Sequence, residues 1–532
     1  MVNTDVQATW AYHDGTKHSH ASVRQGPGGL DWANQPLPYK IYATVPPLPL
    51  PQEVPLPACP AMEALAALPA PQARRIPDLE TLAALCRLSA GITRRLRLPG
   101  GSTIAFRAAA CTGALYHIEL YLVCGDLPGL EAGVYHFGVH DVALRRLRAG
   151  DFRAAVVEAS GHEPAVAAAP VVVVLTTTFW RNAWKYRARA YRHAFWDGGT
   201  ILANLLAVAG GYELPARVVV GFVDATVNRL LDVDPQREVA IALVALGQDE
   251  ATPTDHPLPM PALHLPTQRL SRAEVDYPAI RAMHTASSLT STEEVRAWRE
   301  GLPPYAARHD VATASIGAPG AEAASATGRT IPLAPLADAE LPRDTIAQVI
   351  LRRGSARRFV RRPITFAQLS TMVERATRPV PADFLSGGRA GPAALTDVYL
   401  IVNAVEGLPA GAYVLHRERR ELALLRAGAF RREAGYLALE QALAADAAVN
   451  VYCLAALPPL LARFGNRGYR AAQLEAAVVG GRLYLAAYAL GLGATGLTFY
   501  DDVTAFFSPH AHGKSVMFLT ALGVPARRSS RA

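Results

Sequence analysis

An internal repeat constrains the fold of this chain more than any other feature of its sequence. Residues 121–153 align without a gap to residues 399–431, an offset of 278 positions (399 − 121). The same offset relates "RAYR" (189–192) to "RGYR" (467–470). Glycines recur in matching pairs: Gly129 with Gly407, Gly133 with Gly411, and Gly150 with Gly428. Because the turns recur as well as the strands, the sequence predicts two copies of one domain of roughly 180 residues.

The length and composition of the chain fit two domains with extended segments around them. A chain of 532 residues is too long for a single hydrophobic core. Residues 46–60 are dense in proline, and residues 250–340 are enriched in proline, serine, threonine and alanine. We therefore expect an N-terminal extended segment with a proline-rich tether at 1–60, a first domain at 61–250, a linker at 251–340 and a second domain at 341–532.

Each copy has the same order of expected elements. A helix comes first (78–91 and 365–377), then a pair of strands, a long helix (194–211 and 473–493) and a last apolar strand (240–247 and 515–523). Thr365 and Gln368 fit a capping box at the start of one helix. This order predicts an α+β fold. No GxGxxG motif follows a strand, which argues against a dinucleotide-binding fold.

Charge and composition exclude several classes of protein. The net charge is +8 from 53 basic and 45 acidic residues, and it is spread over the chain. This favours anionic small ligands or acidic peptides over nucleic acid, which requires a concentrated basic face. The five cysteines lack metal-ligand spacing, so we expect reduced thiols and no metal site. No secretory signal or membrane-spanning run is apparent, so we expect a cytoplasmic protein.

One short stretch, "ILRRGSARRFVRRP" (350–363), contains six arginines. A helix should end at Gly354, so that Arg353, Ser355 and Arg357 alternate along the chain that follows. Alternation on an extended chain directs two guanidinium groups and a hydroxyl to one side, which suits a phosphate. A solvated basic loop is the alternative that these residues leave open.

Several motifs together resemble the SagB-type dehydrogenases, which are nitroreductase-like flavoproteins. They are the arginine-rich stretch, "TGALYHIELYLV" (112–123), "WKYRARAYRHAFWDGG" (184–199) and the segment 491–525. The resemblance implies two tandem nitroreductase-like domains, each with a mainly antiparallel sheet flanked by helices, joined as an intramolecular pseudo-dimer. Three positions depart from the family: Cys111 replaces serine, His117 replaces proline and Arg187 replaces glycine.

The resemblance implies an FMN site built from both copies, with its phosphate bound by Arg353, Ser355 and Arg357. The other expected contacts are a small-residue turn (Gly493, Ala494, Thr495 and Gly496), a loop of the first copy (Thr112, Gly113, Ala114 and Leu115), and two basic residues near the C-terminus (Lys514 and Arg528). Ordinary surface charge explains those last two equally well. Because each copy lacks what the other has, we expect one competent site and a decayed opposite pocket.

The activity implied by the resemblance is FMN-dependent oxidation of azoline rings to azoles in a ribosomally made peptide. Lys185 and Tyr186 match the family's acid–base pair. A lysine base must be partly neutral, so we expect an apolar pocket around Lys185, or positive charge nearby from Arg187 and Arg189. A YcaO-like cyclodehydratase is the implied partner, and whether the pseudo-dimer pairs further stays open. The alternatives are an NAD(P)H-dependent nitroreductase or quinone reductase, and a non-catalytic peptide-binding or scaffold protein.

Overall fold

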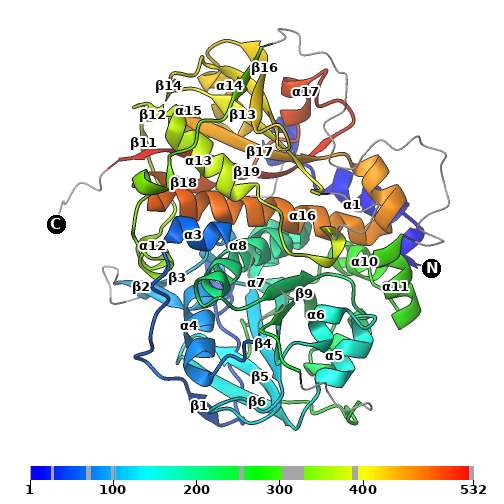
Figure 1. The fold of residues 1–532 in the computed structure, drawn as a ribbon. Helices are drawn as coiled ribbons and strands as arrows, with labels where there is room; N and C mark the ends of the chain where they lie inside the picture. The colour runs from blue at the N-terminus through cyan, green and yellow to red at the C-terminus, as the bar shows by residue number, and fades with distance from the viewer. Residues whose placement is uncertain are drawn as a thin grey trace.

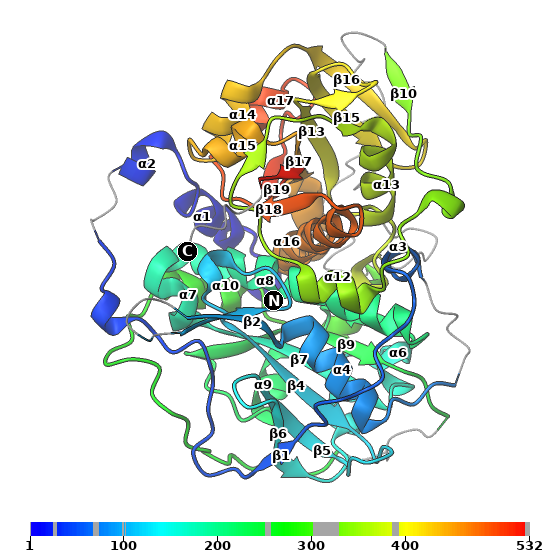
Figure 2. The same ribbon diagram turned by 90° about the vertical axis from the view of Figure 1, so that its left-hand side faces the viewer.

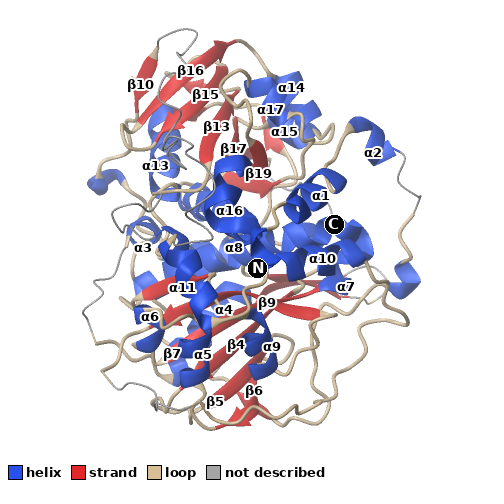
Figure 3. Cartoon of the chain, turned by 90° about the vertical axis from the view of Figure 1, so that its right-hand side faces the viewer, coloured by secondary structure: helices blue, strands red, loops and turns tan. Residues whose placement is uncertain are grey.

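Two bodies make up the molecule, one from each half of the repeat. The computed structural model describes residues 2–24, 29–67, 74–97, 101, 103–250, 257–301, 329–385 and 393–526. In Figure 1 most of the first half, from blue to green, forms the lower body, and the second half, from yellow to red, forms the upper body. Two long helices, α8 (Ala190–Gly211) and α16 (Leu457–Ala489), lie between them (Figure 3).

The first body contains a seven-stranded antiparallel sheet with the order β1-β6-β5-β4-β7-β9-β8. Its strands are β1 (Pro47–Pro49), β4 (Ile118–Cys124), β5 (Gly133–Gly138), β6 (Ala143–Ala149), β7 (Val171–Thr178), β8 (Ala216–Val219) and β9 (Glu238–Leu246). Strands β4, β7 and β9 are buried on both faces. The proline-rich stretch supplies β1 at the edge, where a missing N–H is tolerated.

The second body repeats this strand order. Its sheet runs β10-β16-β15-β13-β17-β19-β11, and β18 pairs with β19 as β8 pairs with β9. The strands are β10 (Thr330–Pro332), β11 (Phe359–Val360), β13 (Asp397–Val402), β15 (Gly411–His416), β16 (Glu421–Ala427), β17 (Val449–Ala455), β18 (Gly493–Gly496) and β19 (Ser515–Pro525). The predicted fold class, two antiparallel sheets with helices in tandem, is therefore confirmed.

Two small two-stranded sheets lie outside these layers. Strand β2 (Ile92–Arg97) pairs with β3 (Thr103–Arg107) as an antiparallel hairpin. Strand β12 (Ile364–Thr365) pairs in parallel with β14 (Val405–Glu406). The hairpin of β2 and β3 projects beside the junction of the two bodies (Figure 2).

The two long helices join the bodies through small residues. A Cβ atom on Gly199 of α8 would lie 2.5 Å from the Cβ of Ala477 on α16, and one on Gly481 would lie 2.5 Å from the Cβ of Ala203. Only glycine allows the helices to approach this closely. The contact makes the chain an intramolecular pseudo-dimer.

Reciprocal ion pairs cross the same junction. Asp224 in the first body binds Arg467 at 2.5 Å and Arg470 at 2.8 Å, and all three are buried. At the matching place in the second body, Asp501 lies 3.6 Å from Arg192 of the first. Burial alone raises the pKa of Asp224, but the two arginines outweigh burial and lower the pKa to about 2.

The remaining helices are shorter. They are α1 (Gln7–Gly15), α2 (His20–Arg24), α3 (Ala61–Ala66), α4 (Leu79–Ala90), α5 (Arg153–Ala159), α6 (Pro164–Ala167), α7 (Phe179–Tyr186), α9 (Asp224–Leu230), α10 (Pro278–Ala286), α11 (Thr292–Glu300), α12 (Ile346–Arg352), α13 (Phe366–Ala376), α14 (Arg431–Leu437), α15 (Ala442–Asp446) and α17 (Val503–Phe507). The predicted capping box is confirmed: Gln368 N donates to Thr365 Oγ1 at 3.1 Å, and Thr365 N donates to Gln368 Oε1 at 3.0 Å.

Four observations bear on other expectations. Helix α16 starts 16 residues before the expected position 473 (473 − 457), with a kink at Gly465. The range 251–340, expected as a linker, includes α10 and α11; its residues 302–328 lie outside the described part.

Among the described residues, no helix combines the length and apolar character needed to cross a bilayer. The same residues include no group of three or more His, Cys, Asp or Glu side chains placed to hold a metal ion.

Candidate functional site

The arginine that follows α12 connects the two bodies. Arg353 donates from Nε to the carbonyl of Ala108 at 2.8 Å and from Nη2 to the carbonyl of Arg107 at 3.0 Å. Its guanidinium carbon lies 5.6 Å from the centre of the Tyr484 ring. The third nitrogen, Nη1, is buried and makes no hydrogen bond with the described residues. Arg353 therefore keeps one donor for a further acceptor.

Tyr484 connects the arginine-rich turn to the small-residue strand β18. Its hydroxyl lies 3.1 Å from Ser355 Oγ and accepts a hydrogen bond from the N–H of Gly496 at 2.5 Å. The N–H of Ala356 donates to the carbonyl of Ala494 at 2.9 Å. These bonds hold the turn and the strand, which are about 140 residues apart in sequence (496 − 355 = 141), against each other.

A loop of the first body is anchored to one buried carboxylate. Asp197 of α8 accepts from the N–H and Oγ1 of Thr112 at 2.9 and 2.8 Å. It also accepts from Cys111 Sγ at 3.0 Å and from His117 Nε2 at 2.9 Å. Two of the three departures from the family motifs, Cys111 and His117, therefore bind the same carboxylate. This anchoring holds the one-turn 3₁₀ segment Thr112–Ala114 in place.

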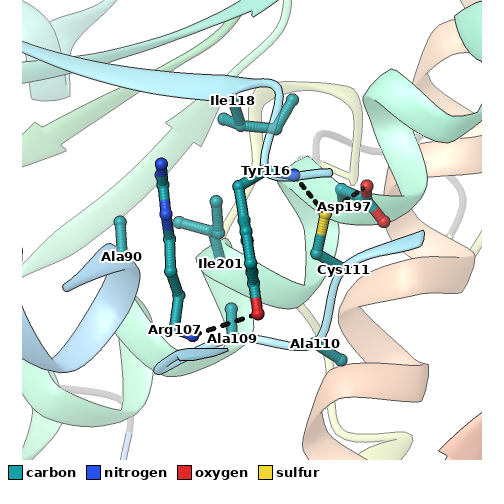
Figure 4. Close-up of a pocket in the computed structure, with 9 residues that line it drawn as sticks. All are labelled: Ala90, Arg107, Ala109, Ala110, Cys111, Tyr116, Ile118, Asp197 and Ile201. Carbon is teal, nitrogen blue, oxygen red and sulfur yellow. Dashed lines mark hydrogen bonds between the residues drawn. The ribbon is translucent and has the colours of Figure 1, made fainter. Parts of the chain in front are cut away.

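Figure 4 shows a small cavity behind this loop, where the Tyr116 side chain stands between Arg107 and Cys111. Arg107 N donates to the Tyr116 hydroxyl at 3.1 Å, and Tyr116 N donates to Cys111 Sγ at 3.1 Å. Burial and the nearby Asp197 raise the pKa of Cys111. The thiol is therefore neutral, a hydrogen-bond donor and not a nucleophile.

The pair Lys185 and Tyr186 ends helix α7. Tyr186 presses its hydroxyl against Gly113, where a Cβ atom would lie 2.8 Å from the phenol oxygen; Gly113 also has φ +64°. Burial raises the pKa of Tyr186, and the negative charge of Asp197 adds to this effect. The phenol therefore stays protonated. Lys185 is exposed, with Nζ 5.3 Å from the centre of the Tyr186 ring.

Two of the expected features around Lys185, the apolar pocket and the charge of Arg189, are not observed, whereas Arg187 is exposed, as Lys185 is. Lys185 is exposed, so the predicted apolar pocket does not enclose it. Arg189 is buried and points away, donating to the carbonyl of Thr16 and lying 3.8 Å from Asp501. The reason is that the 3₁₀ turn after α7 directs Arg189 toward the N-terminal segment instead of toward Lys185.

A row of aromatic side chains leads from Tyr186 into the second body. The Tyr186 and His193 rings have centres 4.5 Å apart, His193 and Trp196 4.8 Å, and Trp196 and Phe518 5.9 Å. Phe518 reaches Gly496, where a Cβ atom would lie 3.5 Å from its ring. Burial lowers the pKa of His193, so the imidazole is neutral. Its Nε2 is buried without a hydrogen-bond partner among the described residues.

Together these contacts form a continuous series across the two bodies, and we call the region that they define the first interface. The series runs from Tyr186 through the aromatic row to Gly496 and then through Tyr484 to Arg353. From Arg353 it returns to Tyr186 through Arg107 and the Thr112–Leu115 loop. The structure thus brings most of the predicted flavin contacts into one region. Arg357 is exposed and takes part in none of these contacts.

Lys514 does not join this region. Its ammonium group binds Asp397 Oδ2 at 2.6 Å and the Tyr399 hydroxyl at 3.0 Å. Leu522, which pairs with Ala494, is eight residues further along β19 (522 − 514), about 25 Å at the usual strand rise. Lys514 therefore sits at the opposite end of the strand. The other basic residue expected there, Arg528, lies outside the described residues.

The pseudo-symmetric counterpart, which we call the second interface, is bonded directly across the two bodies. Val218 N donates to the carbonyl of Pro381 at 2.7 Å. Val220 N and Gly221 N donate to the two carboxylate oxygens of Asp383 at 2.9 and 2.8 Å. At the place that matches β18, backbone N–H groups of β8 and of the two residues after it therefore donate to the other body.

A tryptophan fills the rest of the second interface. Trp298 of α11 is fully buried and donates from Nε1 to the carbonyl of Phe464 at 2.9 Å, with ring centres 5.5 Å apart. Its ring also covers Gly221, where a Cβ atom would lie 2.8 Å away. Phe464 is the counterpart of Tyr186 by the repeat offset (464 − 278 = 186).

Several residues of the first interface, among them Asp197, His193, Tyr484 and Arg107, were missed from the sequence. Asp197, His193 and Tyr484 lie inside long helices whose periodicity indicates only a buried face. Arg107 ends β3, where it resembled an ordinary surface arginine. The available signal was the "WDGG" stretch, in which an acidic residue stands within an apolar helix.

The first interface fits an FMN molecule by its donor chemistry. A buried guanidinium with an unused N–H and the Ser355 hydroxyl suit a phosphate. Strand β18 has small residues whose backbone a planar ring could approach. The second interface offers neither feature, because Trp298 and Asp383 occupy the corresponding places.

Comparisons with known proteins agree with this architecture. Residues 350–526 match the model of the nitroreductase family. A crystal structure from Anabaena variabilis, described as that of a nitroreductase, superposes with a TM-score of 0.73 at 25% identity, covering 98% of this chain and 99% of the other.

Two curated relatives align over shorter stretches. The trifolitoxin-processing protein TfxB of Rhizobium leguminosarum bv. trifolii is 32% identical over 149 residues, 27% of this chain and 40% of TfxB. The microcin B17-processing protein McbC of Escherichia coli is 31% identical over 142 residues, 26% of this chain and 52% of McbC. The chain thus spans about half the length of these two relatives or less. The resemblance to the SagB-type, nitroreductase-like proteins that the sequence predicted is confirmed.

Proposed function

We propose that this protein is an FMN-dependent dehydrogenase that oxidises azoline rings to azoles in a ribosomally made peptide. The observation that carries the proposal is the series of contacts at the first interface. It brings two groups suited to a phosphate, Arg353 and Ser355 of the second body, together with the Tyr186 phenol of the first. Two relatives, TfxB and McbC, are named for the processing of trifolitoxin and of microcin B17. The proposal gives the chain one FMN, because the second interface is filled.

The residues of the first interface would hold the cofactor from both sides. Arg353 Nη1 and Ser355 Oγ would bind the phosphate, and the backbone of β18 would lie along the ring system. The Thr112–Leu115 loop would cover the ring from the other body. When bound, the flavin supplies the acceptor for the two electrons that leave the azoline as hydride.

Converting an azoline to an azole also releases one proton, and the chain must accept it. Lys185 in its neutral form would take this proton, while the Tyr186 phenol, kept protonated by burial, would orient the ring by donating a hydrogen bond.

The test uses the purified chain loaded with FMN and a synthetic peptide with one central thiazoline. We expect one FMN per chain and the loss of two hydrogen atoms per ring by mass spectrometry, with dioxygen consumed. A ratio near two flavins, or a flavin-loaded chain that leaves thiazoline unchanged, would overturn the proposal. A chain that does not bind FMN would favour the alternative of a non-catalytic scaffold protein.

The family match and the Anabaena similarity favour one second candidate, an NAD(P)H-dependent nitroreductase or quinone reductase. Rapid anaerobic bleaching of the flavin by NADPH would support it. Under the leading proposal NADPH bleaches the flavin slowly or not at all.

A YcaO-like cyclodehydratase, present with this chain in the cytoplasm, would supply the azoline substrate of the leading proposal.

A further inference from the structure

Two arginine-rich segments from opposite bodies meet beside the first interface. One consists of β2 and β3 (92–97 and 103–107), and the other is the stretch 351–362, which includes the last two residues of α12 and the chain after it. Neither contains an acidic residue. Both lie on the same side of the junction in Figures 1 and 2. Their exposed arginines without an acidic side chain within 4.0 Å among the described residues are Arg94, Arg95, Arg97, Arg357, Arg358 and Arg362.

The two segments are joined at their bases. Arg353 binds the carbonyls of Arg107 and Ala108, which end the hairpin. Burial lowers the pKa of Arg353, and the charge of Arg94 contributes in the same direction. The charge of Arg94 in the hairpin therefore acts on Arg353 of the other segment, and in the described part of the chain no acidic side chain forms an ion pair with any of the six arginines.

Exposed aliphatic side chains accompany these arginines. Leu96 and Ile104 are directly opposite each other in the hairpin and are 37% and 39% exposed. Leu351 and Val360 in the other segment are each 47% exposed. We call these four aliphatic residues and the six arginines the basic surface. Arginine beside exposed aliphatic groups is typical of protein–protein interfaces.

We propose that the basic surface binds an acidic segment of the peptide substrate, at a distance along the chain from the ring that reacts. The proposal rests on the proposed function and adds to it the chemistry of the part of the substrate that does not react. Uncompensated arginines favour carboxylates, and the aliphatic side chains favour apolar residues between them. A substrate of alternating acidic and apolar character in an extended conformation satisfies both.

The architecture of the surface favours polypeptide over the other anionic ligands. The six arginines are exposed on a hairpin and a loop, whereas a small metabolite needs a concave site. No aromatic side chain is exposed on either segment to stack with nucleic acid bases, since Phe106 lies under Arg94 and Phe359 is buried. The hairpin is also a two-stranded sheet by itself, which is marginally stable alone and gains from an added partner.

The substrate is the source of this segment because of where the surface lies. The loop that bears Arg357 and Arg358 continues directly from Arg353 and Ser355, which the proposed function places on the flavin phosphate. A peptide held with one ring at the flavin passes this loop within a few residues of extended chain. Binding there would lower KM without taking part in the chemistry.

The experiment compares three synthetic substrates on the FMN-loaded full chain. All contain the same pentapeptide with a central thiazoline; one carries no tail, one a (Glu-Leu)4 tail and one a (Ser-Leu)4 tail. We expect a KM at least about tenfold lower for the acidic tail than for the other two, with kcat unchanged. Equal KM values for the acidic and serine tails would overturn the inference.

A charge-reversal variant shows whether the basic surface is responsible. R95E/R97E/R358E changes the net charge from +8 to +2 (8 − 6), and it should remove the advantage of the acidic tail while kcat for the untailed peptide stays the same. The matched control R229E/R269E/R432E makes the same change at exposed arginines elsewhere. It should leave the advantage intact. An equal loss in both variants would mean that only overall charge matters, and would overturn the inference.

Two further readouts separate this inference from the proposed function. If no peptide is oxidised, the proposed function fails, and anisotropy with fluorescein-labelled (Glu-Leu)4 still measures binding to the surface. Binding that R95E/R97E/R358E abolishes, and the control does not, supports the surface alone. Competition by oligothymidylate at the same concentration as (Glu-Leu)4 would overturn the inference in favour of nucleic acid.

Discussion

The first and second interfaces descend from one repeated sequence and have reached opposite states. At the first, Arg353 Nη1 is buried and makes no hydrogen bond with the described residues, and burial keeps the Tyr186 phenol protonated. At the second, Arg75, the counterpart of Arg353 (353 − 278 = 75), forms an exposed ion pair with Glu213, and Phe464 lies under a tryptophan. In a symmetric homodimer both interfaces must stay alike. Within one chain the two interfaces can differ, so one of them can be closed by hydrophobic contacts and ion pairs.

The ion pairs show the same division of roles. Asp224 at the second interface contacts two arginines at 2.5 and 2.8 Å, while Asp501 at the first lies at least 3.6 Å from its arginines. The filled interface has the shorter, fully buried bonds. We therefore expect the second interface to contribute stability and the first to contribute binding, and each prediction below tests one side of this division.

The largest expected effect is on stability, at the second interface. Asp224→Asn leaves Arg467 and Arg470 buried without a counter-charge and should lower the free energy of unfolding by about 3–5 kcal/mol. The matched change Asp501→Asn should cost roughly 1–2 kcal/mol, because its ion pairs are longer. Urea unfolding at pH 7 measures both. Equal costs would contradict the division between the interfaces.

The same carboxylate predicts an acid limit. The pKa of Asp224 in the folded chain, about 2, is below its ordinary value, so the ionised form is stabilised by folding. That stabilisation is complete above the ordinary pKa and is lost as pH falls from about 4 to about 2. In urea unfolding at pH 3, the unmodified chain should lose part of the advantage that it has over Asp224→Asn at pH 7.

The next effect is on binding, at the first interface. Arg353→Ala removes the only buried guanidinium of the arginine-rich turn that is available to a phosphate within the described residues. It should weaken FMN binding about 100-fold in a fluorescence-quenching titration of the flavin-free protein. The counterpart Arg75→Ala should change FMN affinity less than about twofold, because its pair with Glu213 is exposed.

The Arg353 substitution needs a check on folding, since it also breaks two bonds to the first body. Arg353→Lys keeps the positive charge but loses the planar fork, so it should bind FMN with intermediate affinity. If Arg353→Ala and Arg75→Ala weakened FMN binding to the same degree, the two interfaces would be equivalent and a second flavin would be expected.

The repeat predicted most of the fold, because glycine positions recur only where turns recur. The offset of 278 placed α8 opposite α16, and the matching strand orders of the two sheets followed. The capping box at Thr365 was predictable because capping needs only residues three positions apart. Helix starts were less accurate: α16 extends back across Gly465, where a positive φ kinks the helix without ending it.

The site was predictable where its contacts are local in sequence and not where they depend on tertiary distance. Arg353, Ser355 and the Thr112–Leu115 loop carry recognisable motifs and do meet. Lys514 is close to the C-terminus in sequence, but an 11-residue strand separates it from the clamp. Trp298 lies in a segment expected as a linker, and nothing in its sequence showed that it would fill an interface.

The smallest predicted effect uses the backbone beside the proposed acid–base pair. Arg187 follows Tyr186 with φ 50° and ψ −138°, a conformation that favours glycine, and its counterpart Gly465 has φ 59° and ψ −159°. An arginine in that conformation stores about 1–3 kcal/mol of strain, whereas glycine adds up to about 1 kcal/mol of unfolded-state entropy. Arg187→Gly should therefore stabilise the chain by about 1 kcal/mol in urea unfolding.

The reverse change at the counterpart shows whether backbone conformation is the cause. Gly465→Ala places a Cβ atom 2.3 Å from the carbonyl oxygen of Asn3, in addition to the unfavourable φ, so it should destabilise the chain. If Arg187→Gly also destabilised the chain, the contacts of the arginine side chain would stabilise the fold more than its backbone strain destabilises it. Because the strained residue adjoins Tyr186 while the relaxed glycine adjoins Phe464, stabilisation by Arg187→Gly would mean that strain persists at the binding interface and has been removed at the structural one.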